Sequence, residues 1–147
     1  MFVQILIGTL IIILTVLEAG IFFWTAMRMV IRLGPWLVRP VHGIKMVVTM
    51  IVTVFWVQLA ATCATWTWAA AFMALDLFPA WEPAVYFAFA SFTTLGFGDV
   101  LLPQEWRLLS GMAASNGLLL FGLFTAFLVE VLRRIRDEQI KGLPDPE

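Results

Sequence analysis

The sequence contains few charged residues. Only 13% of its 147 residues are Asp, Glu, Lys or Arg, whereas soluble domains carry about 25%. The formal net charge of −1 excludes a generic basic nucleic-acid binder, and we predict no nucleic-acid partner. Hydrophobic residues make up 62% of the chain. A composition this apolar indicates a membrane protein that is in contact with membrane lipids.

Residues that carry redox, metal and acid–base chemistry are also scarce. The sequence has one cysteine and one histidine. Cys63 lies inside an apolar run and has no cysteine partner in the chain, so we interpret it as a small buried apolar residue. The sequence contains no phosphate-binding loop, metal-ligand cluster or catalytic-triad pattern. We therefore predict that the protein is not an enzyme and has no cofactor.

A basic segment is missing before the first apolar run, which argues against a cleaved signal peptide. Three apolar runs lie at residues 2–30, 46–75 and 108–132. Each is long enough to cross a membrane, because a helical span needs about 20 residues. We therefore predict an all-α membrane protein with three transmembrane helices, the first of which is retained.

A shorter apolar and aromatic run at residues 81–92 is too short to cross the membrane. Pro83 suits the first turn of a helix, where its missing N–H costs little. Residues 93–99 follow, with the sequence Thr-Thr-Leu-Gly-Phe-Gly-Asp. Irregular backbone at membrane depth is tolerated only when it is buried in protein or lines a water-filled cavity. The two segments together predict a re-entrant helix that leads into a buried or pore-lining loop.

The loop resembles the selectivity filter of the potassium-channel pore family, whose usual form is Thr-Val-Gly-Tyr-Gly-Asp. In such filters, rings of backbone carbonyls replace the hydration shell of K⁺. The glycines suit this task, because glycine adopts positive φ angles that other residues resist. The resemblance implies a passive potassium-selective channel. It also implies a homotetramer with no cofactor besides the permeant K⁺ ions, since one chain supplies only one strand of the ring.

The resemblance covers residues 46–133 and implies a domain organisation. Residues 1–30 form an additional N-terminal transmembrane helix, residues 31–45 form a cytoplasmic loop, and residues 134–147 form a short cytoplasmic tail. The pore domain between them consists of an outer helix at 46–75, a pore helix at 82–93, the filter at 94–99 and an inner helix at 106–133. The additional helix either stabilises the tetramer from outside the second span or acts as a gating or partner-binding element.

The resemblance also implies roles for individual positions. The K⁺ sites fall on the backbone carbonyls of Thr94, Leu95, Gly96 and Phe97. Positions that support the filter fall on Thr93, Gly98, Asp99, Ser91 and Phe87. Positions that line the cavity and gate fall on Leu118, Phe121, Thr125 and Val129, whose spacing traces one helical face. The hinge of the inner helix falls on Gly117.

Three positions depart from the usual pattern of the family. Phe97 replaces a tyrosine whose hydroxyl bonds to the pore helix, Phe87 replaces a tryptophan donor, and Ala90 stands where some members carry a glutamate. These changes predict a less braced filter, with Ser91 as the remaining polar brace. A weakly selective K⁺/Na⁺ channel is therefore one alternative. A non-conducting accessory subunit is another, although an intact filter argues against it.

The basic residues indicate the orientation of the chain. One cluster lies between the first and second spans and consists of Arg28, Arg32, Arg39 and Lys45. A second cluster follows the third span and consists of Arg133, Arg134, Arg136 and Lys141. On the opposite side there is a single arginine, Arg107. Cytoplasmic loops carry an excess of Lys and Arg. We therefore predict a multi-pass protein of the cell (inner or plasma) membrane, with its N-terminus outside and its C-terminus in the cytoplasm.

Two of the polar residues inside the predicted spans, Glu18 and Asn116, are candidates for a specific role. Glu18 is an intramembrane carboxylate, which is costly and therefore a functional candidate. It is either a pH sensor or a hydrogen-bonding partner for Gln58 or Thr62 on the next helix. Asn116 lies about 200° around the helix from Leu118. We therefore predict that Asn116 faces the pore helix or the outer helix rather than the ion path, and that it makes a structural hydrogen bond there.

Overall fold

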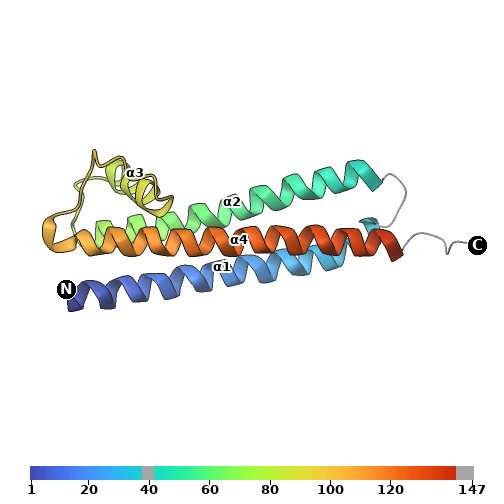
Figure 1. Cartoon of the computed structure of the whole chain (residues 1–147), viewed down its shortest axis with the longest axis horizontal. Coiled ribbons are helices and arrows are strands. Elements are labelled where there is room, and N and C mark those ends of the chain that lie inside the picture. Colours follow the sequence, from blue (N-terminus) through green and yellow to red (C-terminus); the bar gives the residue numbers. More distant parts are fainter. Residues whose placement is uncertain (38–41, 142–147) are drawn as a thin grey trace, which may run out of the picture.

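The computed structural model describes residues 1–37 and 42–141, and within these ranges it contains helices joined by turns and irregular segments, with no strand. Three helices are long, and they lie side by side in Figure 1. They are α1 (Phe2–Leu37), α2 (His42–Ala74) and α4 (Arg107–Lys141). The short helix α3 (Trp81–Phe92) packs against α2 and α4 at one end of the bundle, and the 3-10 turn η1 (Gln104–Trp106) precedes α4.

Three segments are long and apolar enough to cross a membrane; the first two lie within α1 and α2, and the third covers η1 and most of α4. These segments are Phe2–Arg32, Val47–Ala74 and Gln104–Asp137. The 12 residues of α3 would span about 18 Å at 1.5 Å per residue, well short of a hydrocarbon core of about 30 Å. The all-α fold class with three transmembrane helices is therefore confirmed.

The helices continue beyond the apolar runs that predicted them. Most of the loop expected over residues 31–45 is helical, because α1 ends at Leu37 and α2 begins at His42, with residues 38–41 outside the described part of the chain. The inner helix, expected to end at residue 133, continues to Lys141, and the rest of the expected tail, residues 142–147, is likewise outside the described residues. Hydropathy marks the edge of the hydrocarbon, whereas a helix continues as long as its backbone hydrogen bonds remain favourable.

The interior of the bundle combines small residues with a few large aromatic ones. Fully or almost fully buried alanines lie on α2 and α4: Ala60, Ala61, Ala64, Ala69 and Ala113. Small residues let helix backbones approach closely in a membrane. Trp68 and Phe72 of α2 fill the remaining space and have no exposed surface. Because α1 contacts both α2 and α4, the additional helix is part of this core.

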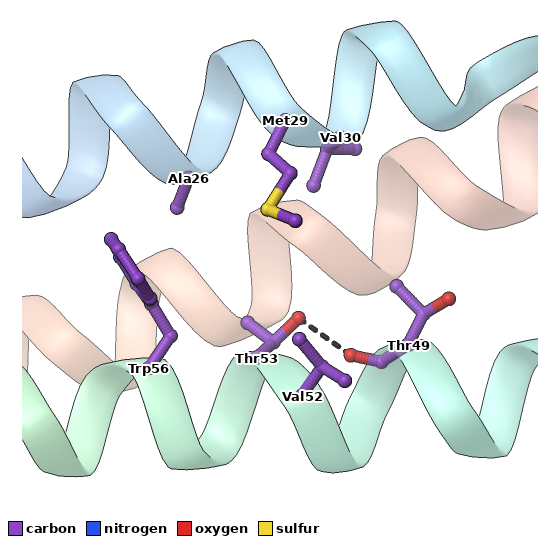
Figure 2. A pocket seen from close by; sticks show the side chains of 7 residues that line it. All are labelled: Ala26, Met29, Val30, Thr49, Val52, Thr53 and Trp56. Atoms are coloured by element: carbon purple, nitrogen blue, oxygen red, sulfur yellow. Dashed lines mark hydrogen bonds between the residues drawn. The ribbon is translucent and has the colours of Figure 1, made fainter.

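A groove lies between the C-terminal half of α1 and the N-terminal half of α2 (Figure 2). Its wall includes Ala26 and Met29 of α1 and Val52 and Trp56 of α2. The Trp56 indole donates a hydrogen bond across to the Phe22 carbonyl oxygen at 3.0 Å. Threonine hydroxyls in the wall donate to carbonyls of their own helix, for example that of Thr53 to the carbonyl of Thr49 at 2.7 Å. The groove therefore presents an apolar surface, which suits contact with lipid.

Candidate ion-conduction site

Helix α3 is held by aromatic packing against α2. Phe87 is buried, and the centroid of its ring lies 5.4 Å from those of both Phe72 and Phe78. Ala84 and Ala88 of α3 have no exposed surface, which places the backbone of α3 close to its neighbours. Phe87 thus anchors the helix that leads into the predicted filter through packing rather than through a hydrogen bond.

The end of α3 rests on the backbone of α4. A Cβ atom placed on Gly117 would overlap the carbonyl oxygen of Phe92, the last residue of α3, and would lie 2.7 Å from its carbonyl carbon. Only a residue without a side chain allows this approach. Gly117 therefore has a packing role in the structure, and its role as a hinge stays a prediction.

The predicted filter has an unusual backbone. Among the described residues from 93 to 99, positive φ angles occur at every second position, with 59° at Thr94, 55° at Gly96 and 76° at Gly98. In regular extended backbone, successive carbonyls point to opposite sides. A left-handed residue at alternate positions turns the carbonyls toward one side, as a carbonyl-lined ion path requires. A positive φ at a non-glycine residue such as Thr94 costs roughly 1–2 kcal/mol, and strain of this kind gathers at functional sites.

Backbone hydrogen bonds tie the filter segment to the end of α3. The Thr94 amide donates to the Ser91 carbonyl at 2.9 Å, and the Gly96 amide donates to the Ala90 carbonyl at 3.1 Å. The Thr93 amide and hydroxyl both donate to the Phe89 carbonyl, at 3.0 and 2.7 Å. The position of the segment therefore follows that of the last turn of α3.

Tyr86 supplies a brace that the sequence analysis missed. Its hydroxyl donates a hydrogen bond of 2.6 Å to Oδ2 of Asp99, while the amide of Val100 donates to Oδ1 of the same carboxylate at 3.0 Å. Ser91 was the only polar brace expected for the filter. This expectation is wrong, because Tyr86 also braces the filter through Asp99. Ser91 itself lines a cleft of about 120 Å³ behind the segment, where its role as a brace stays a prediction. The available signal was that Tyr86 is the single tyrosine of the chain and lies in the predicted pore helix.

The Tyr86 hydroxyl lowers the pKa of Asp99, because its hydrogen bond favours the charged carboxylate, and the same bond raises the pKa of Tyr86. The brace is therefore complete above the ordinary aspartate range, about pH 4, and is lost as the pH falls through the lowered pKa of Asp99. In Tyr86→Phe we expect acid on the side of the membrane that Asp99 faces to inhibit conduction at a higher pH than in the wild type, and current to decay faster. A pH titration of ion flux tests this.

Asp99→Asn provides the control for this titration. Without the carboxylate, removal of the Tyr86 hydroxyl should not move the acid-inhibition curve further. Equal shifts for Tyr86→Phe in the presence and absence of the carboxylate would contradict the role of the pair.

The predicted cavity positions share one free face of α4. Leu118 is 66% exposed and Val129 61% exposed in the single chain, and Phe121 and Thr125 are exposed between them. The opposite face is buried through Leu120, Phe124, Phe127 and Val131. The four positions therefore lie together on a surface that is available to line an ion path.

Residues 44–134 match a protein family described as "Ion channel". The chain belongs to this ion-channel family. The match confirms the resemblance to the potassium-channel pore domain and covers nearly all of α2, together with α3, the filter segment and most of α4. Searches of curated proteins and of solved structures give no significant match. As an ion channel with three apolar helices, the chain is a multi-pass membrane protein, and its family is not one of enzymes.

Besides the bond from Trp56 to the Phe22 carbonyl, side chain–side chain hydrogen bonds join the channel domain to Glu18 and to Thr15 of α1, which lies outside the matched residues. Oε1 of Glu18 accepts a hydrogen bond from the Thr67 hydroxyl at 2.7 Å, so the partner is Thr67 rather than Gln58 or Thr62. Helical side chains lean toward the N-terminus of their helix. Because α2 runs antiparallel to α1, this lean brings the Glu18 carboxylate close to a later residue of α2. Asn116 of α4 makes the predicted structural hydrogen bond, but its partner is Thr15 of α1, so the expected direction toward the pore helix or the outer helix is wrong. The role of Glu18 as a pH sensor stays a prediction.

Proposed function

We propose that this ion channel is a passive, potassium-selective pore that acts as a homotetramer. The alternating left-handed backbone at Thr94, Gly96 and Gly98 is the observation that carries the proposal. With the carbonyls of Thr94, Leu95, Gly96 and Phe97 turned to one side, four chains around an axis would form rings that replace the water of a dehydrated K⁺ ion.

The proposed tetramer needs a surface of each chain that is free to face the central axis. Phe97 is 69% exposed in the single chain, and the apolar positions Leu118 and Val129 on the free face of α4 are exposed as well. Apolar exposure alone would also suit lipid, so what sets this face apart is that it lies on α4, against which the end of α3 and the filter segment rest. We assign the filter segment and this face of α4 to the central axis, where each chain would contribute one strand of the filter.

The brace at Asp99 favours potassium selectivity over the weakly selective alternative. Carbonyl rings distinguish K⁺ from Na⁺ through their size, number and field strength, all of which depend on a filter that keeps its shape. The hydrogen bond between Tyr86 and Asp99 provides support at the outer end, although Phe97 lacks a hydroxyl. Helix α3 adds to cation binding, because a helix C-terminus carries about half a negative charge, and four such ends would meet near the axis.

The proposed orientation has the N-terminus outside and the C-terminus in the cytoplasm of the cell membrane, as the positive-inside rule predicts. The filter then faces the outer solution together with the acidic residues Glu82, Asp99 and Glu105. Negative charge at a pore mouth raises the local concentration of cations.

A bi-ionic measurement tests the proposal directly. The purified chain in a planar bilayer, with K⁺ on one side and Na⁺ on the other, should reverse its current near the potassium equilibrium potential. Robust current that reverses near zero would contradict selectivity and favour the weakly selective channel. A protein that carries no current and does not assemble as a tetramer would contradict the pore itself and favour the accessory subunit.

A further inference from the structure

Helix α1 packs along α4, although the family match does not include it. Near the start of α1, a Cβ atom on Gly8 would overlap the sulfur of Met112, so the Met112 side chain packs directly on the backbone of α1 there. Farther along, the ring of Phe23 stacks on that of Phe127 with centroids 4.6 Å apart, and its edge meets Phe124 at 5.7 Å. The two helices therefore contact each other both before and after the middle of the bundle.

A buried hydrogen bond lies between these contacts. Nδ2 of Asn116 donates to the hydroxyl oxygen of Thr15 at 2.7 Å, and the two residues are 1% and 0% exposed. The Thr15 hydroxyl gives its own proton to the Ile12 carbonyl at 2.9 Å, so its oxygen serves as the acceptor for the amide. Because lipid offers no replacement for a lost polar partner, this bond fixes the register of α4 against α1.

The residue next to Asn116 is Gly117, whose backbone supports the last residue of α3. A movement of α4 at Asn116 would carry Gly117 with it, since neighbouring residues of a helix move together. The carbonyl of Phe92 would then lose its support. From that turn of α3 the amides of Thr94 and Gly96 take their hydrogen-bond acceptors. A continuous series of contacts therefore leads from Thr15 to the filter segment.

We propose that Thr15 and Asn116 are positioning residues of the pore, through which the additional helix holds α4 under α3 and thereby sets the inner end of the filter. This gives α1 a part in ion conduction rather than only in anchoring the chain. The test has a structural arm, which measures hydrogen exchange, and a conduction arm, which measures ion selectivity. Only the conduction arm rests on the proposed function.

Hydrogen–deuterium exchange of the intact protein is the structural arm. Thr15→Val keeps the shape of the side chain but removes the acceptor for Asn116. The matched control is Thr25→Val on the same helix, which loses only bonds to the carbonyls of Ile21 and Phe22. Loss of one hydrogen bond between membrane helices typically changes a conformational equilibrium constant about threefold. We therefore expect exchange at the amides of residues 93–96 to be about threefold faster in Thr15→Val and unchanged in Thr25→Val.

Thr15→Ser separates the hydrogen bond from packing. It retains the hydroxyl and loses a methyl group, so its filter amides should exchange as in the wild type. Faster exchange in Thr15→Ser equal to that in Thr15→Val would assign the effect to packing and overturn the proposal. Equal exchange in Thr15→Val and Thr25→Val would also overturn it. A Thr15→Val protein that does not assemble would assign the bond to assembly and likewise overturn it.

The bi-ionic reversal potential of the same variants is the conduction arm. We expect the permeability ratio of Na⁺ to K⁺ to rise about threefold in Thr15→Val and to stay at the wild-type value in Thr25→Val. An unchanged ratio would contradict the link to the filter. If the wild-type protein carries no potassium current, the proposed function is wrong. The exchange result would still decide the positioning role of Thr15 and Asn116.

Discussion

Gly96→Ala is expected to abolish selective potassium current. Gly96 has a φ of 55°, and a Cβ atom placed there meets no atom within 4 Å in the single chain. The cost of alanine within the chain therefore comes from the left-handed backbone alone, roughly 1–2 kcal/mol. In the proposed tetramer four filter strands carry this cost together. Their combined cost, about 4–8 kcal/mol, is enough to turn the carbonyls away from the axis and reduce current by about a thousandfold or more.

Gly111→Ala is the matched control for this substitution. Gly111 also has open space around its added Cβ atom, but it lies in α4 and has no positive φ. Its variant should conduct as the wild type does. Both variants should assemble equally in detergent, which separates a loss of conduction from a loss of protein. Selective current in Gly96→Ala at the wild-type level would exclude residues 94–97 as the ion-binding segment.

Local patterns predicted much of the architecture. Hydropathy alone located the three transmembrane helices, because the apolar runs exceed the length that a bilayer requires. The glycine-containing motif located the candidate filter, and its alternate positive φ angles occur where the motif has Thr94, Gly96 and Gly98. The spacing of Leu118 and Val129 placed them on one face of a helix, which is exposed in the chain. These features depend on neighbours in sequence, and sequence patterns report such neighbours directly.

The sequence patterns did not predict contacts between segments that are distant in the sequence. Tyr86 and Asp99 are 13 positions apart, and Glu18 and Thr67 are 49 apart. Their pairing depends on the crossing and rotation of whole helices, which hydropathy does not fix. The partner of Asn116 shows the same limit, since its burial was predictable from the helical period but its contact with α1 was not. The role of Gly117 belongs here as well, because its close neighbour is a carbonyl on another helix.

Gly117→Ala is expected to destabilise the protein, and the result distinguishes two roles of this glycine. The added Cβ atom would overlap the Phe92 carbonyl oxygen and lie 3.0 Å from Cγ of the same residue. Because the main obstacle is backbone, no side-chain rotation relieves the overlap. Overpacking costs about 1–3 kcal/mol, whereas alanine gains up to about 1 kcal/mol over glycine in helix propensity. The net effect should be a lower melting temperature of the purified protein.

A hinge would give a different result. If Gly117 served only to let α4 bend, alanine would stiffen the helix, leave the melting temperature equal or higher, and change the time that the pore spends open. The same Gly111→Ala protein serves as the reference, because it adds a methyl group to the same helix without a close contact. A lower melting temperature in Gly117→Ala alone, with faster exchange of the Thr94 and Gly96 amides, would follow from packing. A wild-type melting temperature with altered open times would contradict the packing role, because a backbone overlap cannot be absorbed without displacing α3.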